Sequence, residues 1–502
     1  YLFTVVLARA LGAEGSGAFF VAVAVLTLGE AFAGLGTDVG VVRSIAGYLA
    51  VGRVRDVRTV LRVAYLPAAV ATVLAGLAMF VFARPLADAF DTSAAGDNIA
   101  QIAVYIRVLA AVLPLSVLFD LSIAVTRGFG TMSPDVVLDK VGKAGLQLAL
   151  VAVLVGFAGL RGPAPALAWG LPIAFCFSLG LLAMRSRLHR AENRARRAVR
   201  DGAPDLPARP VREVAAEFWR FSAPRALSGM FKAGIDRIAI ILVAMLVSLQ
   251  DTGVFTGALK YLAAGQFLSL AIMQVMAPRI SEFLAARRQD DARSVYQVAT
   301  GWSMVLTWPV YLTLAGFAPL LLSVLGREFV AGQTAMVILS AAMLLSTAFG
   351  PVTVVLLMGG KSSLNLLNTV VALSAMVALT YLLTGVFGMG IEGAAIAWFV
   401  SIALNNLLPL SQVWRHLHLH PFGKGFSRAL LASVVSFGLV GVLVRLVLGA
   451  SVAGFAVYAV IAGPLYLAFL WKYREPLELT SLKGALKGNM GRRKPPAPQA
   501  AA

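Results

Sequence analysis

Long apolar runs recur from one end of this sequence to the other, and many of them reach 18 residues or more. A run of that length crosses the roughly 30 Å hydrocarbon core of a bilayer as an α-helix. The sequence lacks the strict alternation of transmembrane β-strands, so helices must satisfy the backbone in lipid. Charged residues are only 13% of the chain, whereas a soluble domain carries roughly 25%. We therefore predict an all-α polytopic membrane protein.

About fourteen apolar segments can be drawn along the chain. They lie at residues 1–9, 18–42, 60–83, 101–126, 141–160, 165–184, 218–247, 253–278, 298–322, 332–358, 364–386, 391–413, 427–449 and 452–471. The chain opens with Tyr1-Leu2-Phe3, already inside an apolar stretch. We expect the first transmembrane helix to be incomplete for this reason.

The basic residues gather in alternate loops. The loops after even-numbered segments, together with the C-terminal tail, hold 32 Lys and Arg residues. The opposite loops hold only Arg9, Arg84, Arg161 and Arg327, with Arg445 at a helix end. Basic loops remain on the cytoplasmic side of a membrane, so the pattern predicts cytoplasmic even-numbered loops and a cytoplasmic C-terminus. It also accounts for the net charge of +19 without a nucleic-acid partner, and we expect none.

The longest polar connection divides the chain. It covers residues 185–213, is rich in Arg and contains several prolines. We predict an N-terminal lobe of six helices at 1–184, a basic cytoplasmic linker at 185–213 and a second six-helix lobe at 214–413. Two extra helices at 414–472 and a disordered basic tail at 473–502 complete the prediction. The linker arginines are expected to lie against anionic lipid headgroups.

Two segments look like copies of each other. Gly17-Ala-Phe opens the second segment and Gly253-Val-Phe opens the eighth, and each is followed 26 residues later by an arginine. One offset of 236 aligns them, pairing Glu30 with Gln266 and Asp38 with Gln274. Six segments separate the copies, so both have the same orientation, and the repeat predicts two parallel lobes. Chance is the alternative, because apolar segments align easily.

Several charged residues lie within the predicted spans. A charge at the centre of a span costs about 2.5–3.5 kcal/mol on insertion scales, so it usually faces a cavity or a partner. The cations Arg107, Arg225, Lys232 and Lys260 predict a cationic cavity for an anionic substrate such as a diphosphate, which arginine binds bidentately. The candidate anions, as coupling groups or structural partners, are Glu30, Asp38, Asp120, Asp236 and Glu392.

These charges also have simpler explanations. Arg225, Lys232 and Asp236 share one helical face, so Lys232 and Asp236 can pair with each other. Arg225 can extend to the cytoplasmic interface. Asp236 and Arg237 can form a structural pair between helices. The sequence alone leaves both interpretations open.

Familiar catalytic and metal-binding motifs are missing from the sequence. It contains no P-loop, no His-Glu-x-x-His and no nucleophile elbow. The single cysteine, Cys176, excludes a disulfide within the chain and a multi-cysteine metal site. His416, His418 and His420 are read as interfacial histidines. We expect no enzymatic activity, no cofactor and no metal.

Several short motifs, in this order, resemble those of the polysaccharide transporter and O-antigen flippase family. They are Arg9-Ala-Leu-Gly-Ala-Glu-Gly-Ser-Gly-Ala-Phe, Gly34-Leu-Gly-Thr-Asp, Phe221-Ser-Ala-Pro, Asp236-Arg, Gly253-Val-Phe-Thr-Gly-Ala-Leu-Lys, Ala277-Pro-Arg-Ile-Ser, Gly326-Arg-Glu-Phe and Gly390-Ile-Glu-Gly-Ala-Ala-Ile-Ala. The family belongs to the multidrug/oligosaccharidyl-lipid/polysaccharide exporter superfamily. The resemblance implies two six-helix lobes around a cavity, with two extra C-terminal helices.

The resemblance also implies a function. A member of this family in the bacterial inner membrane would move an undecaprenyl-diphosphate-linked oligosaccharide outward by alternating access. Its expected partners are that substrate, membrane lipids, and a glycan polymerase or glycosyltransferases. A multidrug/cation antiporter and a lipid II flippase of the same superfamily stay open as alternatives. A membrane-embedded glycan polymerase or ligase is disfavoured, because every predicted outward loop is short.

Overall fold

The structure is a computed structural model that describes residues 1–91, 98–201 and 206–475. Within these ranges the chain forms helices and no strand, which confirms the predicted all-α class. Eleven of the described helices are long and apolar enough to cross a membrane. The chain is therefore a multi-pass membrane protein. Most of the predicted basic tail, from residue 476 onward, lies outside the described residues.

The predicted segments all fall on helices, but some contain breaks that the sequence did not predict, among them one between α12 (Gln333–Ala348) and α13 (Val352–Met358). Segments 1–9 and 18–42 both fall in α1 (Leu2–Ala33), which consists of two helices that meet at Gly12. A break that the sequence did not predict follows Ala33, and α2 (Thr37–Ala50) begins after it. Segment 218–247 falls largely in α8 (Val211–Leu246) and most of segment 298–322 in α10 (Gln289–Gly316); both helices are long but are not among the eleven.

The chain divides into two compact units. Unit 1 consists of residues 1–258, 322–332 and 373–397, and unit 2 of residues 259–321, 333–372 and the described residues from 398 onward. Besides α1, α2 and α8, unit 1 contains α3 (Val54–Val81), α4 (Ala83–Phe90), α5 (Ile99–Gly128), η1 (Asp135–Lys143), α6 (Ala144–Val151), η2 (Ala152–Phe157), α7 (Ala164–Arg200), η3 (Arg327–Gly332), η4 (Tyr381–Val386) and the start of α15 (Gly390–Leu417). The predicted lobes at 1–184 and 214–413 stay a prediction.

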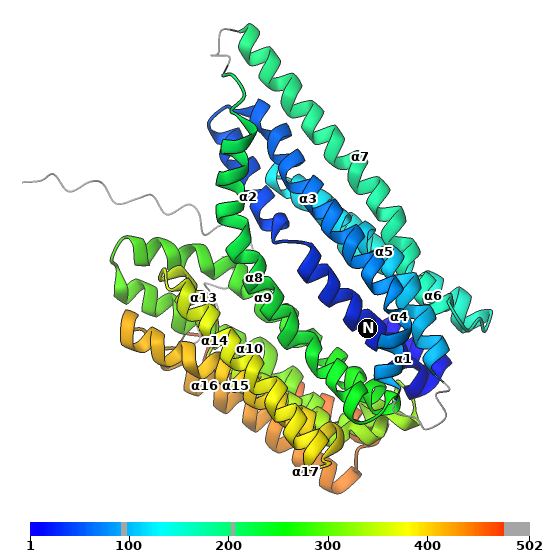
Figure 1. The fold of residues 1–502 in the computed structure, drawn as a ribbon. Coiled ribbons are helices and arrows are strands. Elements are labelled where there is room, and N and C mark those ends of the chain that lie inside the picture. The colour runs from blue at the N-terminus through cyan, green and yellow to red at the C-terminus, as the bar shows by residue number, and fades with distance from the viewer. Residues whose placement is uncertain (92–97, 202–205, 476–502) are drawn as a thin grey trace, which may run out of the picture. The chain divides into compact units, whose positions relative to one another are not determined.

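The helices of unit 1 pack around α5. Figure 1 shows α3, α5 and α7 running side by side, and α1 and α2 also pack against α5. The helix α7 continues to Arg200, so the first part of the predicted linker is helical. The helix α8 packs against α1, α2 and α3, and its Phe218 belongs to the buried cluster that joins α2 to α3.

Unit 2 contains the remaining helices. The helix α9 (Leu249–Ala285) begins in unit 1 and continues into unit 2, and α14 (Ser362–Thr380) runs from unit 2 back into unit 1. The others are α10, α11 (Ala318–Ser323, which ends in unit 1), α12 (Gln333–Ala348), α13 (Val352–Met358), α16 (Lys424–Ser433), η5 (Val434–Leu439), α17 (Val440–Leu448) and α18 (Val452–Lys472).

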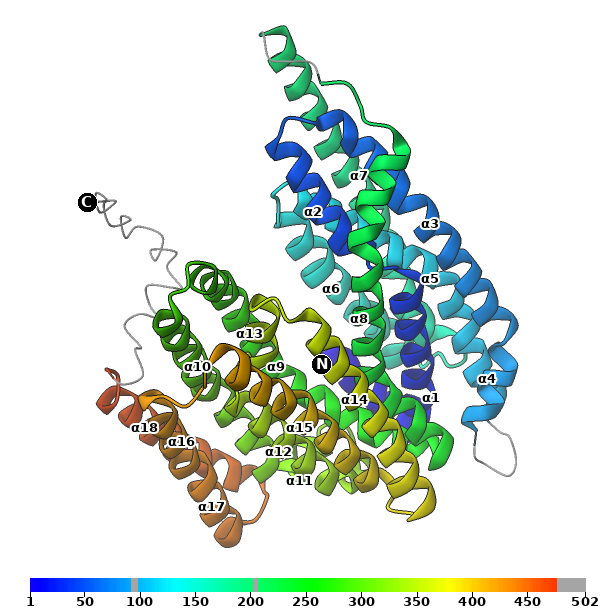
Figure 2. The same ribbon diagram turned by 60° about the vertical axis from the view of Figure 1, so that its left-hand side comes forward.

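The last helices of unit 2 are attached to α10. Figure 2 shows α16, α17 and α18 next to one another, and α16, η5 and α17 pack against α10. The Tyr466 hydroxyl of α18 donates a hydrogen bond to the Val305 carbonyl of α10 at 2.7 Å. The Tyr458 hydroxyl and the Thr313 hydroxyl lie 2.8 Å apart. These polar contacts give the terminal helices a fixed register on α10.

The two glycines of the predicted repeat face each other within unit 1. A Cβ atom on Gly17 would overlap the carbonyl of Leu249, and a Cβ atom on Gly253 would overlap the carbonyl of Ala13. The offset of 236 that pairs Gly17 with Gly253 also pairs Ala13 with Leu249. Gly17 thus meets Leu249 in the same way as Gly253 meets Ala13. Two copies related by a two-fold axis form a reciprocal contact of this kind. The contact therefore supports the repeat at these two segments.

A single carboxylate secures the break inside α1. At Gly12 the backbone has φ 71° and ψ −173°, a conformation that favours glycine. The Ala13 N–H, which begins the next helix, donates to the Glu328 carboxylate at 2.8 Å. Nearby, Arg9 donates from Nε to the Val324 carbonyl at 2.9 Å. The Gly326-Arg-Glu-Phe motif thus provides a cap for a helix start that is distant in sequence.

A buried carboxylate ties the end of the linker to unit 1. Asp56, in the first turn of α3, is 1% exposed. It accepts hydrogen bonds from Arg53 Nε at 2.7 Å, from the Arg209 backbone N–H at 2.8 Å and from Arg209 Nε at 3.2 Å. Arg209 also pairs with Glu217 of α8 at 3.0 Å. We call these four residues the Asp56 latch.

Two further contacts hold the chain at this latch. Arg53 donates to the Pro207 carbonyl at 3.1 Å, and the Arg209 guanidinium lies 4.9 Å from the centre of the Tyr48 ring. Burial of the guanidinium lowers the pKa of Arg209, but its neighbours Tyr48, Glu217 and Asp56 outweigh this effect and the pKa is raised. Arg209 is therefore a permanent cation at the junction of the linker, α3 and α8.

Candidate functional site

The break between α1 and α2 lets α8 approach closely. Gly36 lies in the left-handed region with φ 63°, and the Thr37 hydroxyl donates to the Gly34 carbonyl at 2.7 Å. A Cβ atom on Gly36 would come within 2.8 Å of the Ala226 nitrogen and 2.9 Å of the Ser222 carbonyl oxygen of α8. Glycine is thus required for both the turn and the close packing. The packing carries α8, with its charged residues, to the end of α1.

A second close approach places Glu30 beside α5. A Cβ atom on Gly29 would come within 2.7 Å of the Leu113 side chain, so α1 and α5 lie close together there. The next residue, the half-buried Glu30, is hydrogen-bonded by the Ser116 side chain of α5. The charged groups that act on Glu30 are Asp120, Lys143 and Arg237. Glu30 therefore lies where charges from three other elements converge.

The helix that follows α5 contributes a cation to this region. Residues Asp135–Lys143 form η1, a π-helical stretch of the kind often found at functional sites. Asp139 forms ion pairs with Lys140 and Lys143. The Lys143 ammonium also lies 5.3 Å from the centre of the Phe119 ring of α5, within the range of a cation–π contact.

We call Glu30, Asp120, Asp139, Lys143 and Arg237 the charged cluster. Asp120 is acted on by Lys143, Asp139, Asp38 and Lys140, and its side chain is exposed. Its helix α5 is one of the candidate spans, and an exposed carboxylate in a span must face water or a polar partner. The Nε atom of Arg237 is buried and has no hydrogen-bond partner within the described part of the chain. An anionic ligand that reached this atom would accept its hydrogen bond.

The four basic residues that were predicted to line a cavity lie in different surroundings. Arg225 lies 5.5 Å from the centre of the Phe221 ring, and Arg43 lies 4.1 Å from the same ring. Arg107 lies 5.9 Å from the Phe80 ring. Lys232 is exposed on α8. Lys260 belongs to unit 2, where it is engaged by another group. Their role in binding stays a prediction.

The predicted acidic residues lie in different parts of the structure. Glu30 is in the charged cluster, and Asp38 acts on Asp120. Arg237 lies among the charges that act on Glu30. The side chain of Asp236 lies outside the described residues, so its pairing with Lys232 or Arg237 stays a prediction. Glu392 lies in the first turn of α15, where the helix dipole favours a carboxylate.

Sequence reasoning missed Asp139 and Lys143 as site residues. Lys143 was counted among the basic residues of a cytoplasmic loop, because it sits at the start of an apolar segment. The signal that could have found it is the spacing of Asp139 and Lys143, which is i, i+4 and allows an ion pair on one helical face. In the described ranges, no group of three or more His, Cys, Asp or Glu residues is placed to hold a metal ion.

Comparisons with known proteins agree with the family resemblance. A family model described as "Polysaccharide biosynthesis protein" matches residues 204–331. A probable low-salt glycan biosynthesis flippase of Haloferax volcanii is 22% identical over 190 residues, which is 38% of this chain and 39% of that protein. The matched region thus spans about two fifths of the curated relative. The predicted resemblance to polysaccharide flippases is confirmed.

Solved structures show the same fold. The lipid II flippase MurJ, in an inward closed conformation, superposes with a TM-score of 0.71 at 11% identity, covering 94% of this chain and 96% of MurJ. An inward-facing multidrug resistance transporter of the MATE family gives a TM-score of 0.64 at 16% identity, covering 83% of this chain and 94% of the transporter. At these identities the likeness establishes the fold alone.

Proposed function

We propose that this chain, as a relative of the polysaccharide flippases, moves a lipid-linked oligosaccharide across a bacterial cytoplasmic membrane by alternating access. The substrate would be an oligosaccharide attached through a diphosphate to undecaprenol or a similar lipid. The observation that carries the proposal is the match to a glycan biosynthesis flippase over 190 residues. The fold shared with a lipid II flippase over 94% of the chain supports it.

The proposal includes the orientation of the protein in the membrane and the enzymes that act before and after it. The basic loops and the C-terminus would face the cytoplasm, because 32 Lys and Arg residues lie on that side. The protein would be a transporter and not an enzyme, and it would need no cofactor. Glycosyltransferases that build the glycan, or a polymerase that extends it, would act before and after it. A lipid II substrate is the nearest variant of this proposal.

The charged cluster suggests how transport can be coupled to a cation. Glu30 and Asp120 repel each other, and Lys143 and Arg237 offset that repulsion. A proton or a metal cation that neutralises one carboxylate would make Lys143 available to a diphosphate, which binds cations strongly. Binding of the coupling cation would therefore favour binding of the substrate. Release of one would in turn favour release of the other.

A multidrug/cation antiporter is the second candidate. The same carboxylates could exchange a cation for a cationic drug, and the MATE transporter shares the fold. Deleting the gene separates the two proposals. Accumulation of lipid-linked oligosaccharide on the cytoplasmic side of the membrane supports the flippase. Unchanged glycan together with increased drug sensitivity would refute the flippase in favour of the antiporter.

Replacing Lys143 by methionine should slow export in the deletion strain by at least roughly tenfold. The substitution removes the cation that acts most strongly on Asp120 and one of the two lysines that pair with Asp139. A tenfold slower rate corresponds to about 1.4 kcal/mol. Lys143→Arg should restore most of the export. The measurement is the amount of surface glycan relative to lipid-linked precursor, at matched protein levels in the membrane.

Lys361→Met provides the matched control, since Lys361 is an exposed lysine between α13 and α14. It should export normally. Equal export by Lys143→Met and Lys361→Met would contradict a role for the charged cluster, although it would leave the flippase proposal intact. The predicted cationic cavity is tested in the same strain with Arg107→Ala and Lys232→Ala, and intact transport by both would refute it.

A further inference from the structure

A pocket lies apart from the charged cluster, entirely within unit 1. Its volume is about 560 Å³, within the range of roughly 300–1,000 Å³ that is usual for small-molecule sites. Three separate segments form it: the break in α1, the start of α5, and the loop between η2 and α7. Its lining includes Leu11, Glu14, Asn98, Gln101, Arg161 and Pro163.

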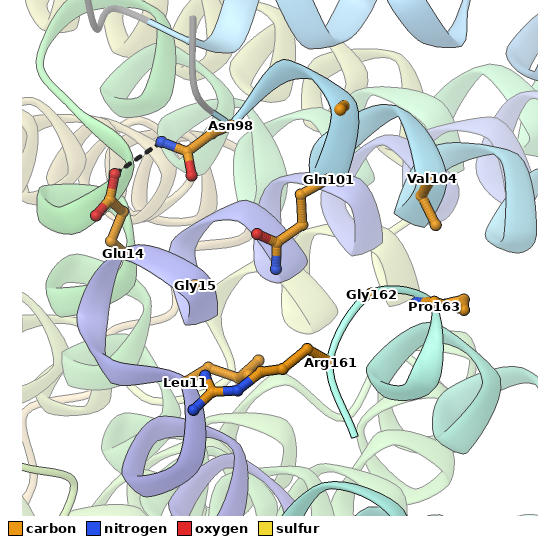
Figure 3. A pocket seen from close by; sticks show the side chains of 10 residues that line it. Leu11, Glu14, Gly15, Asn98, Gln101, Val104, Arg161, Gly162 and Pro163 are labelled. Atoms are coloured by element: carbon orange, nitrogen blue, oxygen red, sulfur yellow. Dashed lines mark hydrogen bonds between the residues drawn. The ribbon is translucent and has the colours of Figure 1, made fainter. Parts of the chain in front are cut away.

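The local structure explains why these segments meet. The chain turns at Gly12, and the cap from Glu328 holds the start of the next helix. Glu14 then lies near the start of α5, where Asn98 donates from its amide to the Glu14 carboxylate at 2.7 Å. Figure 3 shows this bond on one side of the pocket, with Gln101 pointing into the space and Arg161 on the facing loop. All three segments are loops or helix ends that the charge pattern predicts to face outward.

The polar groups of the pocket are mixed in kind. Glu14 uses one carboxylate oxygen for Asn98, which leaves the second oxygen as an acceptor. Gln101 donates from Nε2 to the Tyr105 hydroxyl at 2.7 Å, which leaves its carbonyl oxygen as an acceptor. The Arg161 side chain is exposed, and the Arg161 backbone carbonyl accepts a hydrogen bond from the Ala164 N–H at 3.4 Å. The pocket thus offers acceptors from α1 and α5 and donors from Arg161.

The combination of acceptors and donors favours a sugar over a phosphate group as the ligand of this pocket. A phosphate group only accepts hydrogen bonds, so the oxygens of Glu14 and Gln101 would repel it. A sugar has hydroxyl groups that both donate and accept. Adjacent hydroxyls can donate to Glu14 and Gln101 while another accepts from Arg161. The apolar side chains of Leu11 and Pro163 can cover the C–H face of the ring.

We propose that this pocket is a saccharide-binding subsite on the outward side of unit 1, which holds part of the glycan after translocation. The proposal rests on the proposed function, since it takes the ligand from the transported glycolipid. It adds a second place of contact, remote from the diphosphate-binding charges.

The test measures binding by the full chain purified in detergent. The probe is the mixture of oligosaccharides that mild acid releases from the lipid-linked glycans of the source cells, followed by saturation-transfer NMR. Inorganic phosphate is measured in parallel. We expect the oligosaccharides to bind and phosphate not to compete. Arg161→Ala and Glu14→Gln should each weaken the oligosaccharide's binding roughly ten- to a hundredfold, the usual effect of losing a charged hydrogen bond.

Arg84→Ala is the matched control. Arg84 is an exposed arginine on the same predicted side, at the start of α4 and outside the pocket. It should bind the oligosaccharides as the parent does. Three results would overturn the subsite: no binding of the oligosaccharides, binding of phosphate in their place, or equal binding by Arg161→Ala and Arg84→Ala. Export in the deletion strain is scored separately, so a chain that exports glycan without binding the free oligosaccharides refutes the subsite alone.

Discussion

Replacing Asp56 by alanine is expected to lower the free energy of unfolding by about 3–5 kcal/mol, the usual range when one partner of a buried ion pair is removed. Asp56 is 1% exposed and accepts three hydrogen bonds from Arg53 and Arg209. Without it, two guanidinium groups face each other at the junction of the linker and α3. The Arg209 N–H also loses its acceptor. The measurement is denaturant unfolding of the purified protein in detergent.

The control for this prediction is Asp290→Ala. Asp290 also lies in the first turn of a helix and pairs with an arginine three residues away, at 3.2 Å, but its side chain is 96% exposed. An exposed pair of this kind contributes about 0–1 kcal/mol. Equal losses in the two variants would show that burial of Asp56 does not matter. A loss confined to Asp56→Ala would show that the linker end is fixed to unit 1 by this latch.

Replacing Gly17 by alanine is expected to destabilise the protein by at least about 3 kcal/mol, at the upper end for overpacking. A Cβ atom at this position would overlap the Leu249 carbonyl, and neither backbone can yield without shifting a helix. Export should fall with it. Thermal unfolding in detergent measures the first effect, and surface glycan in the deletion strain measures the second.

Gly47→Ala is the control for a glycine in a helix. Gly47 lies in α2, and a Cβ atom there would have no atom within 4 Å. The substitution should therefore be neutral or stabilise by up to about 1 kcal/mol, the difference in helix propensity. The pair Gly17→Ala and Gly253→Ala should be strongly non-additive, because the first substitution already separates the two helices. Additive losses would contradict a direct contact between the two glycines.

Local signals in the sequence were sufficient to locate most of the helices. Length and apolar character located every predicted segment on a helix, because in lipid each helix satisfies its own backbone. The sequence also aligned Gly17 with Gly253 at an offset of 236, although it did not predict that the two glycines meet. The break after Ala33 was not predicted, because Gly34-Leu-Gly-Thr lies inside an apolar run, and its left-handed turn at Gly36 is fixed by packing against Ser222 and Ala226.

The candidate site was only partly predictable. Glu30 and Arg237 were identified because a charge in an apolar segment stands out. Lys143 did not stand out, because it lies at the edge of a segment among other lysines. Its importance comes from its neighbours Phe119, Asp120 and Asp139. The first two belong to α5, and sequence spacing alone does not say which of its side chains lie beside Lys143.

The sequence by itself therefore determined that this is a multi-pass helical membrane protein that resembles polysaccharide flippases. These properties depend on length, composition and short motifs, which are local. The tertiary structure alone decided which charges act on one another across helices: Arg237 acts on Glu30, Lys143 acts on Asp120, and Arg209 contacts Asp56 directly. It also assembled the pocket from three distant segments. These contacts between residues on different helices depend on close helix packing at glycines. The sequence of one segment does not specify which other segment it packs against.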